Sequence, residues 1–198
     1  MPQRVLIILS VSILVLSFQF VSDWTKEKED DGIVVYTRTI TGKSYLEYKT
    51  DFKVYAILAR VKEVITAVDS YKEWMPSTVE SRIVRKKSDS VFYAYTVTET
   101  PWPASSRDLA FKGTVQKVDA NTFRITYTEA PTSVPENKKY VRIKGYRAIW
   151  ELTQQSPDYV MVSFRFTFDP GSTYPNWMIK NGIVSARIDV AKSLRKRV

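Results

Sequence analysis

Apolar and polar residues alternate along most of the chain between residues 33 and 169, which is the pattern of strands with one buried face. Residues 46–54 show it most clearly, because every second side chain is apolar or Thr and those between are charged. One face of the predicted sheet is therefore in water. The strands that the pattern predicts span residues 33–40, 44–54, 79–86, 91–99, 107–118, 122–129, 140–153 and 159–168.

Helical spacing replaces the alternation in three places. Residues 55–68 and 71–76 predict two short helices, the second of them stopped by Pro76. Residues 175–198 predict one amphipathic helix of about 20 residues. Its apolar stripe consists of Trp177, Val184, Ile188, Ala191 and Leu194. Its basic residues fall mostly outside that stripe and are Lys180, Arg187, Lys192, Arg195 and Lys196.

This order of elements predicts the fold class. A sheet with one long helix at its end must bury the apolar stripe of that helix against its concave face. We therefore predict an α+β fold, in which a curved antiparallel β-sheet wraps around a long C-terminal α-helix and two short helices follow the first two strands.

Two segments depart from the regular patterns. Residues 23–31 are strongly charged, and they predict a linker or a first short helix. Along residues 140–153 the apolar alternation slips by one position between Ile143 and Tyr146. Gly145 lies at the slip and predicts a β-bulge or a sharp bend.

Residues 1–22 have the composition of a targeting segment, in which Arg4 precedes an apolar run and a more polar end. We predict a signal peptide, with an uncleaved N-terminal membrane anchor as the alternative, followed by one domain over residues 23–198. In either form the folded domain lies outside the cytoplasm. We therefore expect an exported protein (periplasmic or secreted) or a membrane-anchored one.

The amino-acid composition excludes several kinds of catalytic and metal site and indicates the charge of a partner. The chain has no His and no Cys, which removes thiol nucleophiles, imidazole bases, disulfides and the usual zinc sites. Its formal net charge of +9 favours an anionic partner. No nucleic-acid-binding motif accompanies the basic clusters, so an anionic membrane surface is the expected partner, with a solvated basic face as the plain alternative. We expect a monomer with no cofactor and no metal.

Several short motifs, taken in order, resemble the START (StAR-related lipid transfer) family of the helix-grip superfamily, over roughly Trp24 to Val198. They are Trp102-Pro103, Arg107-Asp108, Gly145, Ile149-Trp150-Glu151-Leu152, Asp169-Pro170-Gly171 with Pro175 and Trp177, and the segment Ala191 to Arg197. The resemblance implies an internal hydrophobic tunnel under the C-terminal helix that holds one lipid or other apolar molecule. It implies neither catalysis nor a metal.

Strand parity suggests which residues line that tunnel. Arg107 shares a face with Leu109 and Phe111, whereas Tyr93 and Tyr95 share a face with Glu99 in the preceding strand. If both faces point inward, Arg107 and Glu99 must pair or bind the polar head of a ligand, because an unpaired buried charge is costly. The alternative is that Arg107 and Asp108 brace the loop 101–106. The remaining cavity candidates are Trp102, Tyr146, Phe164, Phe166, Trp177, Val184 and Ile188.

Three functions are compatible with these observations. The first is the binding, and the possible transfer, of a lipid or other hydrophobic ligand in the tunnel. The alternative is a helix-grip superfamily enzyme, cyclase- or hydrolase-like, that acts on an apolar or aromatic substrate through Arg107, Glu99 and a Tyr hydroxyl. The third is a non-catalytic binder of a small signal, or an interaction module with an empty core.

Overall fold

The computed structural model describes residues 23–100, 104–171 and 176–198, and within these ranges ten strands form a single sheet. The strands are β1 Thr25–Asp30, β2 Ile33–Thr39, β3 Leu46–Val54, β4 Thr78–Ser88, β5 Val91–Thr98, β6 Arg107–Lys117, β7 Thr122–Glu129, β8 Val141–Arg142, β9 Lys144–Ser156 and β10 Tyr159–Asp169. The helices are α1 Leu58–Thr66, η1 Val68–Ser70, α2 Tyr71–Trp74, η2 Pro131–Ser133 and α3 Asn176–Arg197.

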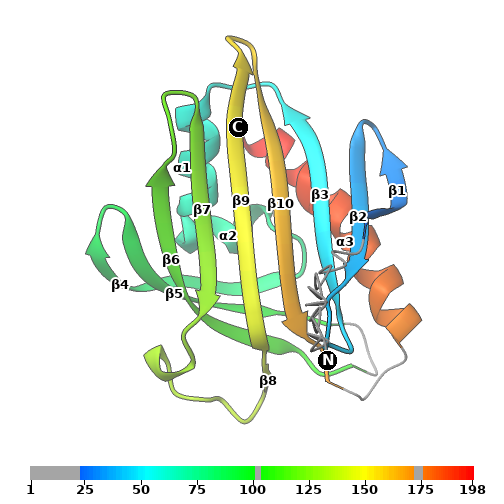
Figure 1. Ribbon diagram of the computed structural model, residues 1–198. Helices are drawn as coiled ribbons and strands as arrows, with labels where there is room; N and C mark the ends of the chain where they lie inside the picture. Colours follow the sequence, from blue (N-terminus) through cyan, green and yellow to red (C-terminus); the bar gives the residue numbers. More distant parts are fainter. Residues whose placement is uncertain (1–22, 101–103, 172–175) are drawn as a thin grey trace, which may run out of the picture.

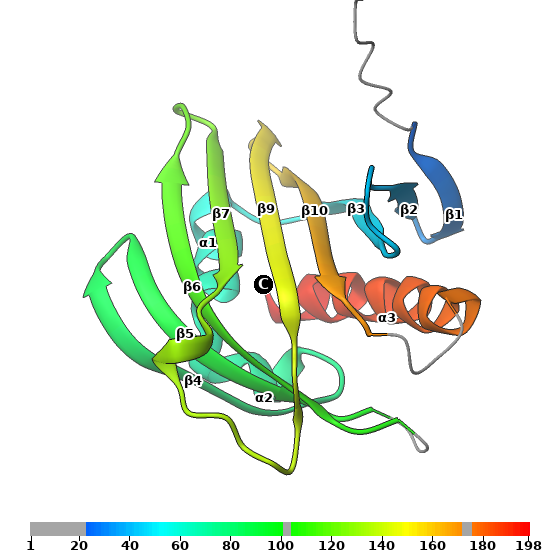
Figure 2. The same ribbon diagram turned by 60° about the horizontal axis from the view of Figure 1, so that its bottom comes forward.

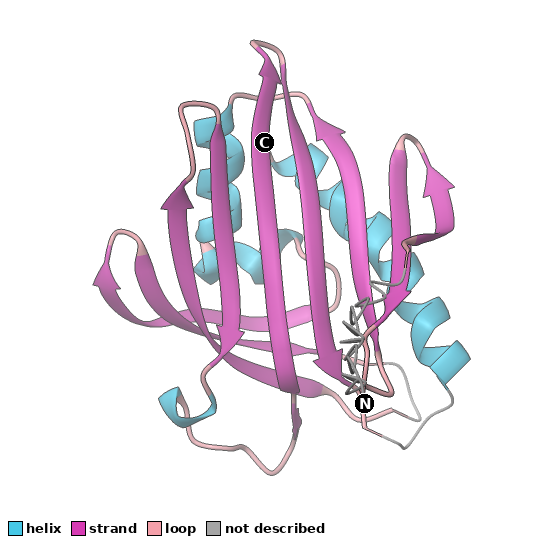
Figure 3. Ribbon diagram, in the orientation of Figure 1, coloured by secondary structure: helices cyan, strands magenta, loops and turns pink. Residues whose placement is uncertain are grey.

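The sheet follows the order β1-β2-β3-β10-β9-β7-β6-β5-β4 with antiparallel pairs throughout, and the short β8 pairs in parallel with β6. The strands β4 and β5 run nearly across the direction of β9 and β10, so the sheet is strongly curved (Figure 1). The helices α1, α2 and α3 all lie on one side of it (Figure 3). Figure 2 shows α3 running beneath β3 and β10. The predicted fold class is confirmed.

The charged segment at residues 25–30 is a strand and neither a linker nor a helix, so that prediction was wrong. β1 pairs with β2 at the edge of the sheet. An edge strand can carry charges on both faces, and for that reason it lacks the apolar alternation that reveals a strand in a sequence. The Glu27 carboxylate points to the helix side, where it accepts hydrogen bonds from Thr37 at 2.5 Å and from Lys180 on α3 at 2.9 Å.

The predicted bulge at Gly145 is confirmed. Thr167 of β10 pairs with Arg147, and Asp169 pairs with Lys144, so two residues of β9 face one residue of β10. Gly145 has a φ of +64°, a left-handed conformation that favours glycine. The bulge bends β9 near its start and turns the following side chain, Tyr146, toward the helix side of the sheet, where it packs against the core.

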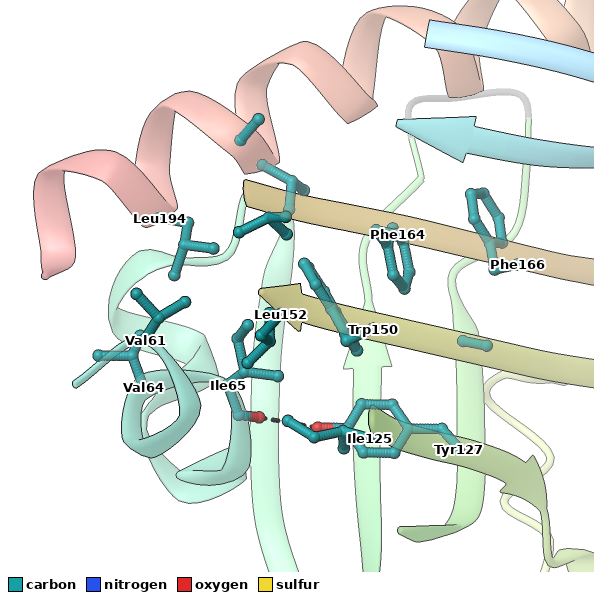
Figure 4. Packing of buried hydrophobic residues seen from close by; sticks show 14 of the residues in the cluster. Val61, Val64, Ile65, Ile125, Tyr127, Trp150, Leu152, Phe164, Phe166 and Leu194 are labelled. Carbon is teal, nitrogen blue, oxygen red and sulfur yellow. Dashed lines mark hydrogen bonds between the residues drawn. The ribbon is translucent and has the colours of Figure 1, made fainter. Parts of the chain in front are cut away.

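The core fills the space between the sheet and the helices. Val61 and Ile65 of α1 pack with Leu194 of α3 and Leu152 of β9, and all four are fully buried (Figure 4). The hydroxyl of Tyr127 donates a hydrogen bond of 2.7 Å to the carbonyl oxygen of Ile65, drawn as a dashed line in Figure 4. This bond satisfies a buried carbonyl near the end of α1 and fixes the helix to β7.

The N-terminal segment predicted as a signal peptide or anchor, residues 1–22, lies outside the described residues. Within the described ranges, no helix has both the length and the apolar character needed to cross a membrane.

Candidate functional site

A row of aromatic rings crosses the concave face of the sheet beneath α3. Trp150 of β9 stacks on Phe164 of β10 with ring centroids 3.9 Å apart, and Phe164 lies 5.3 Å from Phe166 (Figure 4). Phe166 is followed by Phe168 at 6.2 Å, and Tyr48 of β3 stacks beside it at 5.2 Å. The alternation of β10 produces this row, because every second side chain of an extended strand points to the same face.

A small pocket opens where this row ends. It is lined by Ser44, Tyr45, Leu46, Tyr48, Phe168, Pro170, Ile179 and Ile183. These residues come from the β2–β3 connection, from the end of β10 and from the first half of α3. The cavity volume of about 20 Å³ leaves room for about one water molecule. The pocket is therefore far smaller than a lipid, and it marks the point where the row of rings meets the surface.

Arg187 of α3 is the charged group that faces this row. Its guanidinium lies 5.5 Å from the ring centroid of Phe164 and 4.9 Å from that of Phe166. Its Nε is fully buried and makes no hydrogen bond, and no ion pair joins Arg187 to any described carboxylate. Burial lowers the pKa of Arg187 to about 10, and the nearby Tyr146 opposes this only in part.

The other basic residues of α3 are placed differently. Lys180 pairs with Glu27, Lys192 with Asp30, Arg195 with Asp31 and Arg197 with Glu73, at N···O distances between 2.6 and 2.9 Å. Lys196 is exposed to solvent. Arg187 thus differs from its neighbours on the helix, because it is turned inward and has neither a carboxylate nor full access to water.

Two further polar groups lie near the aromatic row beneath α3. Tyr146 interacts electrostatically with Arg187 and with Tyr71 and Tyr127, and burial raises its pKa to about 12. Thr50 of β3 pairs with Phe164 across the sheet, and its buried hydroxyl makes no hydrogen bond to any described residue. The interior beneath α3 is therefore apolar in its walls, with a cation and one buried hydroxyl, that of Thr50, which lack partners among the described residues.

Six of the sequence-predicted cavity residues lie together in the core beneath the helices. They are Leu109, Phe111, Phe164, Phe166, Val184 and Ile188. Tyr146 packs against the same cluster. Trp177 does not belong to it: its side chain is 63% exposed at the start of α3, so its place in the predicted apolar stripe was wrong. In the first turn of α3, Trp177 and Met178 are exposed, whereas Ile179 lines the pocket. Trp102 lies outside the described residues.

The side chains of β5 point to the opposite faces of the sheet from those that we predicted from the alternation of the strand. Ala94 is opposite Phe111, and both point into the core, whereas Tyr95 is opposite Ala110 and points to the other side of the sheet. Tyr93 shares that outer face, where Arg85 covers its ring, and Glu99 is exposed. The prediction that these three residues line the cavity was therefore wrong. Both faces of β5 carry apolar residues, so alternation alone could not tell them apart.

The outer face of β5 and β6 is covered by the segment that precedes β9. Tyr95 and Ala110 pack there against Val134. Asp108 is 1% exposed and receives hydrogen bonds of 3.0 and 2.9 Å from Arg142, and Tyr95 donates a third of 3.0 Å. Arg142 also donates to the carbonyls of Pro131, Val134 and Pro135. Asp108 therefore holds the segment 131–142, through Arg142.

Arg107 does not pair with Glu99, and the expected ion pair was wrong. Arg107 is half-buried on the face of Leu109 and donates to the Thr100 hydroxyl at 3.5 Å and to the carbonyl of Ser105 at 3.2 Å. These bonds favour the alternative in which Arg107 braces the loop before β6. The arginine that faces the aromatic row is Arg187.

Comparisons with known proteins agree with this architecture. A family model described as polyketide cyclase / dehydrase and lipid transport matches residues 54–192. A STAR-related lipid transfer protein from Xanthomonas axonopodis is 28% identical, with a TM-score of 0.78 over 87% of this chain and 97% of that one. Human StAR-related lipid transfer protein 5 is 17% identical, with a TM-score of 0.80 over 91% of this chain and 88% of that one.

Two further comparisons extend the range of relatives. An uncharacterised protein of Pseudomonas aeruginosa is 24% identical over 87% of this chain and 85% of its own length. An aromatase/cyclase from a Streptomyces species is 10% identical, with a TM-score of 0.54 over 76% of this chain and 92% of that one, which shows a shared fold. The START resemblance read from the sequence motifs is confirmed.

Proposed function

Because the chain belongs to the polyketide cyclase / dehydrase and lipid transport family, we propose that it binds a lipid or another hydrophobic molecule beneath α3 and carries it unchanged. The observation that carries this proposal is the aromatic row from Trp150 to Phe168, which leads from the core to the pocket at the surface. Apolar walls with a few polar groups are typical of sites for small hydrophobic ligands.

Ligand entry requires α3 to move. Sites for drug-sized ligands have volumes of about 300–1,000 Å³, far above the 20 Å³ of the pocket. The ion pairs that join α3 to β1 are partly exposed, and such pairs contribute only about 0–1 kcal/mol each. Gly182 lies within α3 and weakens the helix by about 1 kcal/mol relative to Ala. The first half of α3 can therefore separate from the sheet at modest cost.

The interior is better suited to holding a molecule than to changing it. General acids and bases work best with a pKa near the operating pH. The pKa values of Tyr146 and Arg187 are about 12 and about 10, and the chain has no His or Cys to supply a group that titrates near pH 7. These observations support a carrier over the cyclase-like enzyme that the fold also accommodates.

We further propose that the carrier exchanges its ligand at an anionic membrane surface outside the cytoplasm, as a monomer, after export through residues 1–22. The exposed Trp177 and Met178 support this proposal, because they immediately precede Ile179, which lines the pocket. Aromatic side chains favour the interface between lipid and water. The formal net charge of +9 adds attraction to anionic lipids.

The test is a transfer assay between vesicles. Donor vesicles of phosphatidylcholine, with and without phosphatidylglycerol, carry a pyrene-labelled lipid, and transfer to unlabelled acceptor vesicles is followed by fluorescence. The purified full chain should accelerate transfer, and more so with phosphatidylglycerol present. Trp177→Ser should slow it, whereas Ile57→Ser removes a side chain of similar exposure, 62% against 63%, from a site away from the pocket and should not.

A wild-type chain that neither takes up nor transfers any labelled lipid would overturn the proposed function. Equal slowing by Trp177→Ser and Ile57→Ser would overturn only the membrane contact. It would mean that the loss of an exposed apolar side chain slows transfer whether or not the side chain lies near the pocket. Chemical conversion of the labelled molecule during the assay would favour the enzyme over the carrier.

A further inference from the structure

We propose that Arg187 binds the negatively charged head of the ligand, so that the natural ligand is a long-chain carboxylic acid. This inference rests on the proposed function, since it names the class of molecule bound at the same site. Three observations carry it: the inward orientation of Arg187, the absence of any described carboxylate partner, and the buried hydroxyl of Thr50, across the sheet from Phe164, which makes no hydrogen bond to any described residue.

A buried cation without a counter-ion is unfavourable for a folded protein, and such groups are normally paired. Four other cations on α3 have carboxylate partners, and β1 supplies two of these. Arg187 lies on the same helix but over Phe164 and Phe166, where the rings offer a weak electrostatic attraction in place of an anion. The arrangement leaves a position for a counter-ion that the protein itself does not fill.

The charge and shape of the site point to a carboxylate. A guanidinium binds planar carboxylates through two parallel hydrogen bonds, and both bonds are strengthened by charge. Arg187 is a single positive charge, and no other unpaired cation among the described residues faces the aromatic row, so a head with one negative charge neutralises it. The hydroxyls of Tyr146 and Thr50 can donate further hydrogen bonds to the carboxylate oxygens.

The walls define the rest of the ligand. Trp150, Phe164 and Phe166 give the row aromatic faces, and Ile183 of α3 continues the apolar lining to the pocket. The pocket itself is also lined by Ser44, Tyr45 and Tyr48, whose hydroxyls can form hydrogen bonds. The molecule is therefore an amphiphile with a compact acidic head and a mainly hydrocarbon body.

The experiment compares two molecules that differ in charge alone. Radiolabelled oleate and radiolabelled methyl oleate are each supplied from phosphatidylcholine vesicles to the purified full chain, and equilibrium binding is measured at pH 8 after the vesicles are removed. A third arm supplies radiolabelled phosphatidylglycerol, which also has one negative charge. The variants are Arg187→Met, Arg187→Lys and, as a matched loss of one charge from the same helix, Lys196→Met.

Charge-assisted hydrogen bonds predict that the wild type binds oleate at least about tenfold more tightly than methyl oleate. Arg187→Met should abolish this preference while its affinity for methyl oleate stays within about threefold of wild type. Arg187→Lys should keep part of the preference, because it retains the charge without the planar fork. Lys196→Met should keep all of it.

Each other result has a definite meaning. Equal binding of oleate and methyl oleate by the wild type overturns this inference and leaves the proposed function intact, whether or not the variants fold. Binding of phosphatidylglycerol without oleate overturns the assignment of a carboxylic acid. Failure to bind any of the three molecules overturns the proposed function and this inference with it.

Discussion

Replacing Arg187 with Met should make the ligand-free protein more stable, although it removes the group that we propose holds the ligand. Burial lowers the pKa of Arg187 from the ordinary value of a guanidinium to about 10. Since each pKa unit is worth about 1.4 kcal/mol, holding this side chain charged in the folded state costs about 3 kcal/mol at neutral pH. Methionine has a similar length, carries no charge and packs well against aromatic rings.

The expected increase in the free energy of unfolding is reduced because the arginine makes favourable contacts of its own. Its guanidinium faces Phe164 and Phe166, and each such contact is worth about 0.5–1 kcal/mol. The sulfur of methionine regains part of this through its own contacts with the rings. We therefore expect a net increase of about 1–3 kcal/mol in the free energy of unfolding, or about 3–10 °C in Tm for a chain of this size.

The assay is urea and thermal unfolding of the purified full chain without added lipid, followed by circular dichroism. Lys196→Met is the matched control, because Lys196 is exposed and its loss should change the free energy of unfolding by less than about 0.5 kcal/mol. An Arg187→Met chain that is less stable than wild type would refute the reasoning. It would mean that the guanidinium has an anionic partner in the ligand-free protein.

The difference in stability between wild type and Arg187→Met should depend on pH in a definite direction. The folded state holds the Arg187 proton less tightly than the unfolded state does, so from about pH 10 up to the ordinary pKa of a guanidinium the unfolded chain binds more protons. Wild-type stability therefore rises with pH in this window relative to Arg187→Met, which lacks the group. The advantage of the variant should be constant from pH 7 to pH 9 and should shrink by about 1 kcal/mol by pH 11. A constant advantage at every pH would refute the assigned cause.

Three other predictions test the scaffold around the site. Asp108→Ala leaves the buried Arg142 without its carboxylate, so it should lower the free energy of unfolding by about 3–5 kcal/mol, measured in urea; a loss below 1 kcal/mol would contradict the structural role of this pair. Gly113→Ala would place a Cβ atom 2.3 Å from the Phe92 ring and should cost about 1–3 kcal/mol. A Cβ atom added at Gly182 meets no atom within 4 Å, so Gly182→Ala should instead stabilise α3 by up to about 1 kcal/mol. If α3 must bend to open, this substitution should also slow ligand exchange.

Much of the fold could be predicted because its elements bury one face each. The alternation along β3 and β10 and the stripe from Val184 to Leu194 predict strands and a helix at the correct places. The slip of phase at Gly145 predicts the bulge. The segment β1 could not be predicted in the same way, because an edge strand made of charged residues buries neither face and has no apolar period.

The site was harder to predict than the fold. Tyr95 was placed on the wrong side because the segment 131–142 covers the outer face of β5 and makes both faces of this strand apolar. Arg187 was set aside as one of several basic residues of the helix. Its position could have been noticed, since it lies three residues after Val184 and one before Ile188, within the stripe that faces the core. A charge inside an apolar stripe was the available signal.

The central claim is that the space beneath α3 holds one amphiphilic molecule, and the most direct test is to see what the protein retains. The full chain is purified under native conditions from a membrane-containing host, its mass is measured by native mass spectrometry, and bound molecules are extracted and identified. The account predicts one long-chain acid per chain in the wild type and a reduced amount in Arg187→Met. A chain that is empty after purification, and that also fails to take up oleate or any other lipid, would contradict it.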